Sequence, residues 1–118
     1  MKSCEDLIIY KEYMILLQYT EHIVIKYPKI ERNVMVEDIR KRTYEGISYI
    51  IYASNELDKN KRIKILSRLD SNLKILKVLV RISFKKKYIS GKNYYAWSKK
   101  ITDIGMLTGG WIRACVRQ

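Results

Sequence analysis

One apolar stripe sets the strongest constraint on how this chain can fold. Leu66, Leu69, Leu73, Leu76 and Val80 follow one another at intervals of 3, 4, 3 and 4 residues. This is the spacing of one face of an α-helix. No proline or glycine interrupts residues 58–89, so the pattern predicts a single long helix over residues 60–88.

Apolar periodicity predicts three further helices, at about residues 5–27, 34–57 and 91–117. Pro28 ends the first of them, because proline cannot continue the helical hydrogen bonds and restricts the residue before it. Asn33 and Ser90 are expected as N-caps of the second and the last. Glu5 and Asp6 are expected in the first turn of the first helix, where acidic side chains suit the helix dipole.

The core-facing residues follow from the same spacing. The first helix has two adjacent apolar arcs, Leu7, Tyr10, Met14, Leu17 and Val24 in one, and Tyr13, Leu16, Ile23 and Tyr27 in the other. The second helix is expected to turn inward Val36, Ile39, Thr43, Ile47, Ile50 and Leu57. The last has an amphipathic stripe of Trp97, Ile101, Ile104, Thr108, Trp111 and Cys115. Within it, Gly105 and Gly109 are expected where a neighbouring helix comes close.

These elements predict an all-α protein, an antiparallel up-down-up-down four-helix bundle. With 118 residues and neither a repeat nor a low-complexity tract, the chain is expected to form a single domain over residues 1–118.

The net positive charge comes entirely from the second half of the chain, because basic and acidic side chains nearly balance in residues 1–57. The net charge is +12, and residues 58–90 alone carry 11 basic and 2 acidic side chains. Such asymmetry indicates a polyanionic partner or an acidic protein surface. The alternative is a solvated surface that serves solubility.

Two groups of cations are the candidate binding residues. Lys74, Lys77, Arg81 and Lys85 fall within about a quarter-turn of one another on the third helix. Arg113 and Arg117 share with Lys99 a face of the fourth helix that is turned away from Trp111. A row of this kind can follow phosphates, with salt-dependent affinity.

A second apolar arc on the third helix lies outside the leucine stripe. Its members are Ile75, Val78, Leu79 and Ile82. An exposed apolar arc usually marks an interface, so it predicts homo-oligomerisation. The alternative is a broad core that contacts both neighbouring helices.

Catalytic and metal-binding patterns are missing. A di-iron bundle needs Glu-x-x-His motifs, but His22, the one histidine, has Tyr19 at that offset. Cys4 and Cys115 stand at opposite ends, without metal or redox spacing. We therefore expect no enzyme, no metal and no cofactor. The longest uncharged run, residues 46–55, is too short to span a membrane, and a soluble cytoplasmic protein is expected.

Three segments resemble the accessory variability determinant (Avd) family of bacterial diversity-generating retroelements. They are Tyr27-Pro28-Lys29-Ile30-Glu31-Arg32, Leu76-Lys77-Val78-Leu79-Val80-Arg81 and Ile104-Gly105-Met106-Leu107-Thr108-Gly109-Gly110-Trp111-Ile112. The resemblance spans about residues 10–117, and its most specific part is the Gly-x-x-x-Gly-Gly-Trp pattern.

This resemblance implies a four-helix bundle that assembles into a basic homopentameric barrel. It also implies a bacterial or phage-encoded accessory protein that binds the retroelement's reverse transcriptase and nucleic acid, RNA or DNA. Lys77 and Arg81 match basic positions of the family; Lys74, Lys85, Arg113 and Arg117 extend that role by charge pattern. An interaction module of the type encoded within intervening sequences of ribosomal RNA genes, without a reverse transcriptase partner, remains the alternative.

Overall fold

Four α-helices form most of the protein in the computed structural model, which describes residues 7–118. They are α1 (Ile8–Val24), α2 (Met35–Asn55), α3 (Lys59–Lys85) and α4 (Gly91–Val116), with a 3₁₀ helix η2 (Lys29–Glu31) after α1. No strand occurs in this part of the chain, and the predicted all-α class is confirmed. Cys4, Glu5 and Asp6 lie outside the described residues.

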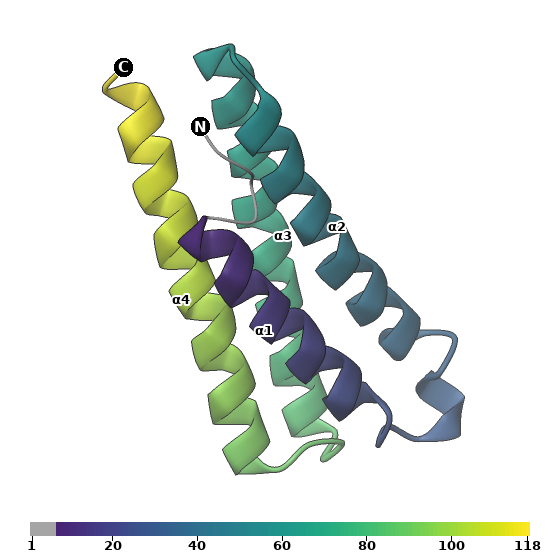
Figure 1. Ribbon diagram of the computed structural model, residues 1–118. Helices are drawn as coiled ribbons and strands as arrows, with labels where there is room; N and C mark the ends of the chain where they lie inside the picture. Colours follow the sequence, from purple (N-terminus) through teal and green to yellow (C-terminus); the bar gives the residue numbers. More distant parts are fainter. Residues whose placement is uncertain (1–6) are drawn as a thin grey trace.

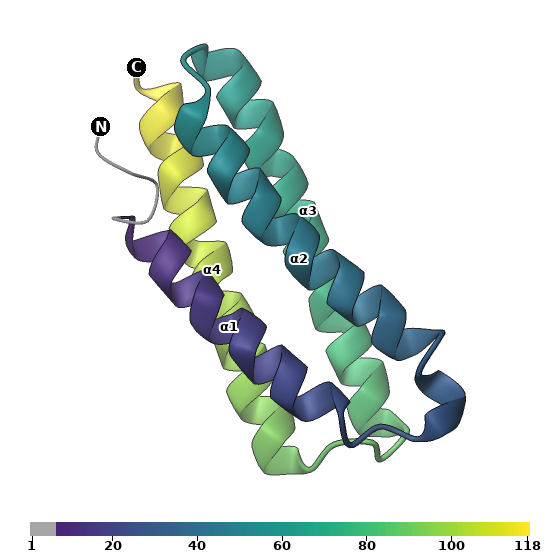
Figure 2. The ribbon, with the colours of Figure 1, turned by 45° about the vertical axis from the view of Figure 1, so that its right-hand side comes forward.

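The helices pack side by side along their length. Each contacts the next one in the chain, and α1 also contacts α4. Figures 1 and 2 show the α2–α3 connection and the C-terminus at one end of the molecule, and the α1–α2 and α3–α4 connections at the other. The long axis measures 46 Å and the two short axes 22 Å each. Because α3 lies between α2 and α4, its outer surface borders both.

The leucine stripe of α3 forms the centre of the core, as its spacing predicts. All five side chains from Leu66 to Val80 are at most 3% exposed. The helix begins at Lys59 because Asp58 caps it, accepting hydrogen bonds from the backbone N–H of Asn60 at 2.9 Å and of Lys61 at 3.0 Å.

The end of α3 falls at Lys85, three residues before the predicted end. Lys87 has a φ of 65°, in the left-handed region that stops a helix. The next amides then bond backward, Lys87 N–H to Phe84 O at 2.9 Å and Tyr88 N–H to Ser83 O at 3.0 Å. These two bonds are the pattern of a Schellman cap, with a lysine where glycine is usual.

Lys87→Gly is therefore expected to stabilise the protein by about 0.5–1 kcal/mol, because glycine adopts a positive φ without the steric cost that a side chain brings. Urea unfolding measures the difference. Lys87→Ala is the control, since it removes the same charge but keeps the strained φ. Equal stabilisation by both variants would mean that charge, and not backbone strain, limits stability at this position.

Helix α1 ends at Val24 instead of Tyr27. The backbone N–H groups of Lys26 and Tyr27 bond to carbonyls only three residues back, at 3.2 Å each, because the residue before Pro28 is kept out of the α-helical region. Of the two apolar arcs, the structure buries Tyr13, Leu16, Ile23 and Tyr27, together with Ile9, Thr20 and Val24. In the other arc, residues 7, 10, 14 and 17 are only half-buried.

Hydrogen bonds fix α1 to both of its neighbours. Tyr13 donates its hydroxyl to the Thr43 carbonyl of α2 at 2.6 Å. On the other side, the Trp97 indole N–H of α4 donates to Thr20 Oγ1 at 3.1 Å. Tyr13, Thr20 and Trp97 are completely buried, so water cannot replace these partners.

Helix α4 buries five of its six predicted residues, whereas α2 buries three of six, with Val36 and Ile47 half-buried. Three further predictions need correction. Leu57 is 93% exposed, because α2 already ends at Asn55 and Glu56 is extended. The N-cap of α2 is Val34, which has no side-chain cap, instead of Asn33. Trp111 is half-buried at the edge of the core. The predicted cap of α4 is confirmed, since Ser90 Oγ accepts from Asn93 N–H at 3.1 Å.

The close approach expected at the glycines of α4 does not occur there. Among residues 7–118, a Cβ on Gly105 would meet nothing within 4 Å beyond the backbone of its own helix, and one on Gly109 would meet only the Arg113 guanidinium of that helix at 3.3 Å. The close approach lies at Gly46 of α2, where an added Cβ would overlap the phenol oxygen and Cζ of Tyr13. The sequence reasoning missed this glycine.

Candidate nucleic-acid interface

Four of the six predicted binding residues follow α3 along its border with α4. Lys77 marks the border, because its Nζ donates a hydrogen bond to Oγ1 of Thr102 on α4 at 2.7 Å. Lys74 and Arg81 lie one turn to either side of it, and Lys85 one turn further. Lys77 is half-buried and the other three are exposed.

The other two predicted residues, Arg113 and Arg117, continue this surface on α4. They follow Thr102 by 11 and 15 residues, about three and four helical turns, so they lie on the same side of the helix. Both are exposed. We call the surface that carries these six cations and Thr102 the α3–α4 face.

Acidic side chains on this surface are held by lysines. Asp70 Oδ2 lies 3.0 Å from Lys74 Nζ, and Asp103 Oδ2 lies 3.0 Å from Lys99 Nζ. The hydrogen bond to Asp103 raises the pKa of Lys99. Exposed pairs of this kind contribute little to stability, so Lys74 can exchange its carboxylate for an anionic ligand at small cost.

Arg62, also on α3, has a structural role that the sequence did not suggest. Its Nε and Nη2 donate to the Glu56 carbonyl at 2.9 and 2.6 Å. Its Nη1 lies 3.4 Å from Gln118 Oε1 and 3.8 Å from Sγ of the buried Cys115. This guanidinium therefore joins the end of α2 to the end of α4.

Exposed aromatic rings accompany the cations and were not predicted as site residues. Phe84 is 39% exposed and stacks on Tyr94 of α4, with ring centroids 4.5 Å apart and an interplanar angle of 3°. Tyr95 is 69% exposed. Their spacing in the sequence could have identified them as neighbours of the cations. Phe84 follows Lys77 by seven residues and Tyr95 precedes Thr102 by seven, which is two helical turns in each case.

At the end of α3, a buried acid restrains one of the three consecutive lysines. Glu31 of η2 accepts a hydrogen bond from the Tyr88 hydroxyl at 2.7 Å, and Lys86 Nζ lies 3.6 Å from the same carboxylate. The hydrogen bond from Tyr88, followed by the charge of Lys86, lowers the pKa of Glu31. Lys86 is exposed like Lys85 and Lys87, but its ammonium group is engaged by a carboxylate of the same molecule.

The predicted oligomer arc lies toward the α2 side of α3, about a quarter-turn around the helix from the row of Lys74, Lys77, Arg81 and Lys85. Ile75 and Val78 are 43% and 48% exposed, while Leu79 and Ile82 are half-buried. Leu79 packs against the core, as the alternative interpretation expected for the whole arc. Ile75 lines a hollow between α2 and α3 together with Glu45, Tyr49 and Arg68.

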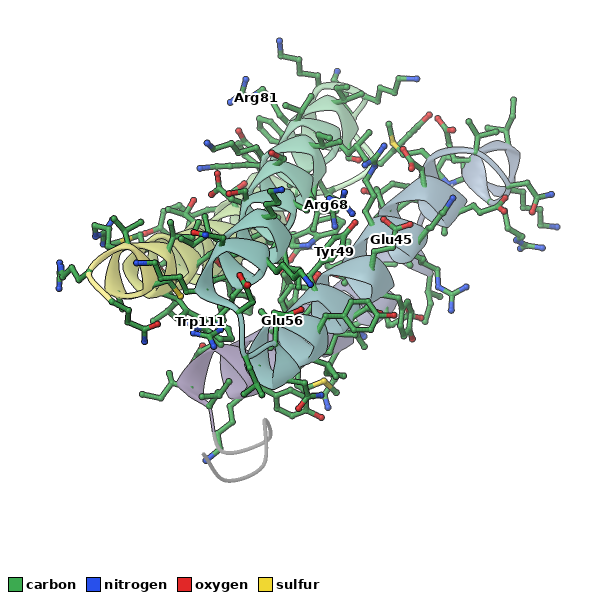
Figure 3. All side chains as sticks on the ribbon, turned by 90° about the horizontal axis from the view of Figure 1, so that it is seen from above. Glu45, Tyr49, Glu56, Arg68, Arg81 and Trp111 are labelled. Atoms are coloured by element: carbon green, nitrogen blue, oxygen red, sulfur yellow. The ribbon has the colours of Figure 1, made fainter. Side chains whose placement is uncertain are left out.

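Figure 3 shows the hollow between α2 and α3 from above, with Glu45 and Tyr49 on α2 and Arg68 on α3. Arg81 extends outward at another part of α3. The hollow between α2 and α3 and the α3–α4 face thus lie along different borders of α3. A separate hollow, with an apolar lining, lies between α1 and α4 and is formed by Leu7, Ile8, Ile9, Leu107 and Trp111.

Within residues 7–118, no three His, Cys, Asp or Glu side chains gather as metal ligands would. His22 is exposed in the last turn of α1. None of the four helices is long and apolar enough to cross a membrane, in the part of the chain that the structure describes.

Comparison with known proteins places these observations in a family. The model of the bAvd-like family matches residues 7–115, which is nearly the whole chain. No curated protein matches it.

Proposed function

The chain belongs to the bAvd-like family, and from this membership we propose that it is a non-catalytic accessory protein of a diversity-generating retroelement. In this proposal it binds the element's reverse transcriptase and nucleic acid, template RNA or cDNA, in the cytoplasm of a bacterium. Its action supports mutagenic reverse transcription and retrohoming.

The gathering of cations on the α3–α4 face is the observation that supports binding. Six basic side chains from two helices border one seam, and five of them are exposed. A polyanion that contacts such a row releases counterions, which gives affinity without any deformation of the bundle. An acidic surface of the transcriptase would use the same cations.

The proposal includes assembly of up-down-up-down bundles into a homopentameric barrel. The α1–α4 hollow and the exposed residues Ile75 and Val78 support it, because both are apolar and lie on different sides of the bundle. Two unlike surfaces that pack head to tail generate a ring when the rotation closes. The repeated α3–α4 face would then form a continuous cationic surface.

The double variant Lys77→Glu and Arg81→Glu is expected to lose binding to the reverse transcriptase and to RNA, with the fold intact. Arg81 is exposed, and Lys77 Nζ bonds to the exposed Thr102, so neither supports the core. Co-purification with the transcriptase, RNA titrations at several salt concentrations and light scattering are the measurements. The wild-type protein should scatter as five chains, and the salt slope should fall by about 2 in the variant if both cations contact phosphates.

Lys11→Glu with Lys41→Glu is the matched control, because it changes the charge equally at exposed positions of α1 and α2. Equal loss in both double variants would point to net charge alone. Unchanged capture by the Lys77 and Arg81 variant would refute the proposed face. Absence of any reverse transcriptase partner for the wild-type protein would favour the ribosomal intervening-sequence type of module.

A further inference from the structure

A hollow opens on the α3–α4 face beside Lys74 and Lys77. It is lined by Asp70, Leu73, Lys74, Lys77, Ile101, Thr102, Gly105 and Met106. Leu73 and Ile101 belong to the core and form its apolar floor, while Met106, 70% exposed, stands at its edge. The hollow is thus apolar at its base and cationic at its rim.

Gly105 keeps this hollow open. A glycine inside a helix is less favourable than alanine, and Gly46 shows what can offset that cost, because Tyr13 occupies the space of its missing side chain. At Gly105 no other atom of residues 7–118, apart from the adjoining backbone of α4 itself, comes within 4 Å of the place where a Cβ would stand. The space is therefore available to a group from outside the described chain.

The rim defines the chemistry of that group. Lys77 Nζ is held at the α4 side by Thr102, and Lys74 Nζ at the α3 side by Asp70. Arg81 follows one turn along α3, and the exposed rings of Phe84 and Tyr95 follow in the same direction. A suitable ligand combines flat apolar groups with a chain of negative charges.

We propose that this hollow receives an unstacked base of a single-stranded nucleic acid, whose flanking phosphates contact Lys74 and Lys77. The inference rests on the proposed function and narrows its nucleic-acid ligand to single strands. Aromatic faces interleaved with cations are typical of proteins that bind single strands. A duplex keeps its bases stacked inside and presents only phosphates to such a face.

The hollow suits a single flat group better than a partner helix. It holds about 230 Å³, whereas a helix with its side chains is about 10–12 Å across. An acidic helix could place only one side chain there, and its carboxylates would have to reach the same lysines. Protein docking at this hollow is accordingly an outcome that the experiment distinguishes.

Gly105→Leu fills the hollow and tests the proposal in the full-length protein. Fluorescence anisotropy would follow a labelled 20-nucleotide oligo(dT), an oligo(U) of equal length and a 20-base-pair duplex. We expect the affinity for both single strands to fall by about tenfold or more, as loss of one stacked base implies, and the affinity for the duplex to stay the same. Ala114→Leu is the control, because it adds the same side chain at an exposed position half a turn away around α4.

Circular dichroism and thermal unfolding should show that Gly105→Leu folds, since no described residue lies within 4 Å of the new Cβ and the hollow beside it is open. Gly105→Ala adds a smaller side chain, and we expect it to lower the affinity for single strands by less. Unchanged single-strand affinity in Gly105→Leu, or equal losses for single strands and duplex, would overturn the inference and leave the proposed function standing. If Gly105→Leu lost binding to a 20-residue oligo-glutamate peptide but kept its affinity for oligonucleotides, the hollow would be a protein-docking site and not a base-binding site. Failure of the wild-type protein to bind any oligonucleotide would count against its proposed nucleic-acid role as well.

Discussion

Gly46→Ala is expected to destabilise the protein by about 3 kcal/mol, at the upper end of what overpacking a core costs. The new methyl group would overlap the Tyr13 ring, which is completely buried and hydrogen-bonded to Thr43. The ring must move, and its hydroxyl then loses its partner inside the core. The melting temperature should fall by about 10 °C, as measured by circular dichroism.

Gly105→Ala is the matched control for this prediction. It makes the same change inside another helix, α4, where no described residue lies within 4 Å of the added Cβ. The better helix propensity of alanine should then stabilise the protein by about 0.5–1 kcal/mol. Opposite signs for the two substitutions would confirm that the phenol ring sets the requirement at Gly46, while equal effects would contradict it.

Arg62→Ala is expected to lower stability by about 2 kcal/mol, the range of hydrogen bonds that involve a charged group. The substitution leaves the Glu56 carbonyl without its two guanidinium donors and separates the α2–α3 connection from the end of α4. Urea unfolding measures the loss. The affinity for nucleic acid should change little, because this cation is engaged inside the protein.

Arg62→Lys separates geometry from charge. Lysine keeps the positive charge but has no planar fork of donors that reaches Glu56 and Gln118 together. We expect it to recover only a minor part of the lost stability. If Arg62→Lys were as stable as the wild type, a point charge would suffice there and the bridging role would be wrong.

The sequence predicted the helices well because their apolar spacing is local. The leucine stripe of α3 and the Ser90 cap each depend on residues within one helix or its first turn, and both were identified correctly. Leu57 was assigned to the core because it continues the spacing of α2. Its assignment failed because the Asp58 cap starts α3 at Lys59 and α2 stops short of it.

Contacts between helices were harder to predict. Gly46 and Tyr13 lie 33 residues apart, and neither helix shows a pattern that joins them. Gly105 and Gly109 were assigned a close approach because their spacing is typical of one, yet the spacing does not say which surface they face. The six candidate cations came from angular position along single helices. Their common seam became visible only when Lys77 was found against Thr102.

The buried hydrogen bonds of α1 fix the rotation of this helix about its own axis. Its two apolar arcs differ by about a third of a turn, and hydrophobicity alone would leave the two orientations close in free energy. Rotation by that angle would carry the Tyr13 hydroxyl away from Thr43 and Thr20 away from the Trp97 indole. Each buried polar group that loses its partner adds an energy penalty. These buried polar atoms thus increase the free-energy difference between the native bundle and one in which α1 is rotated about its axis.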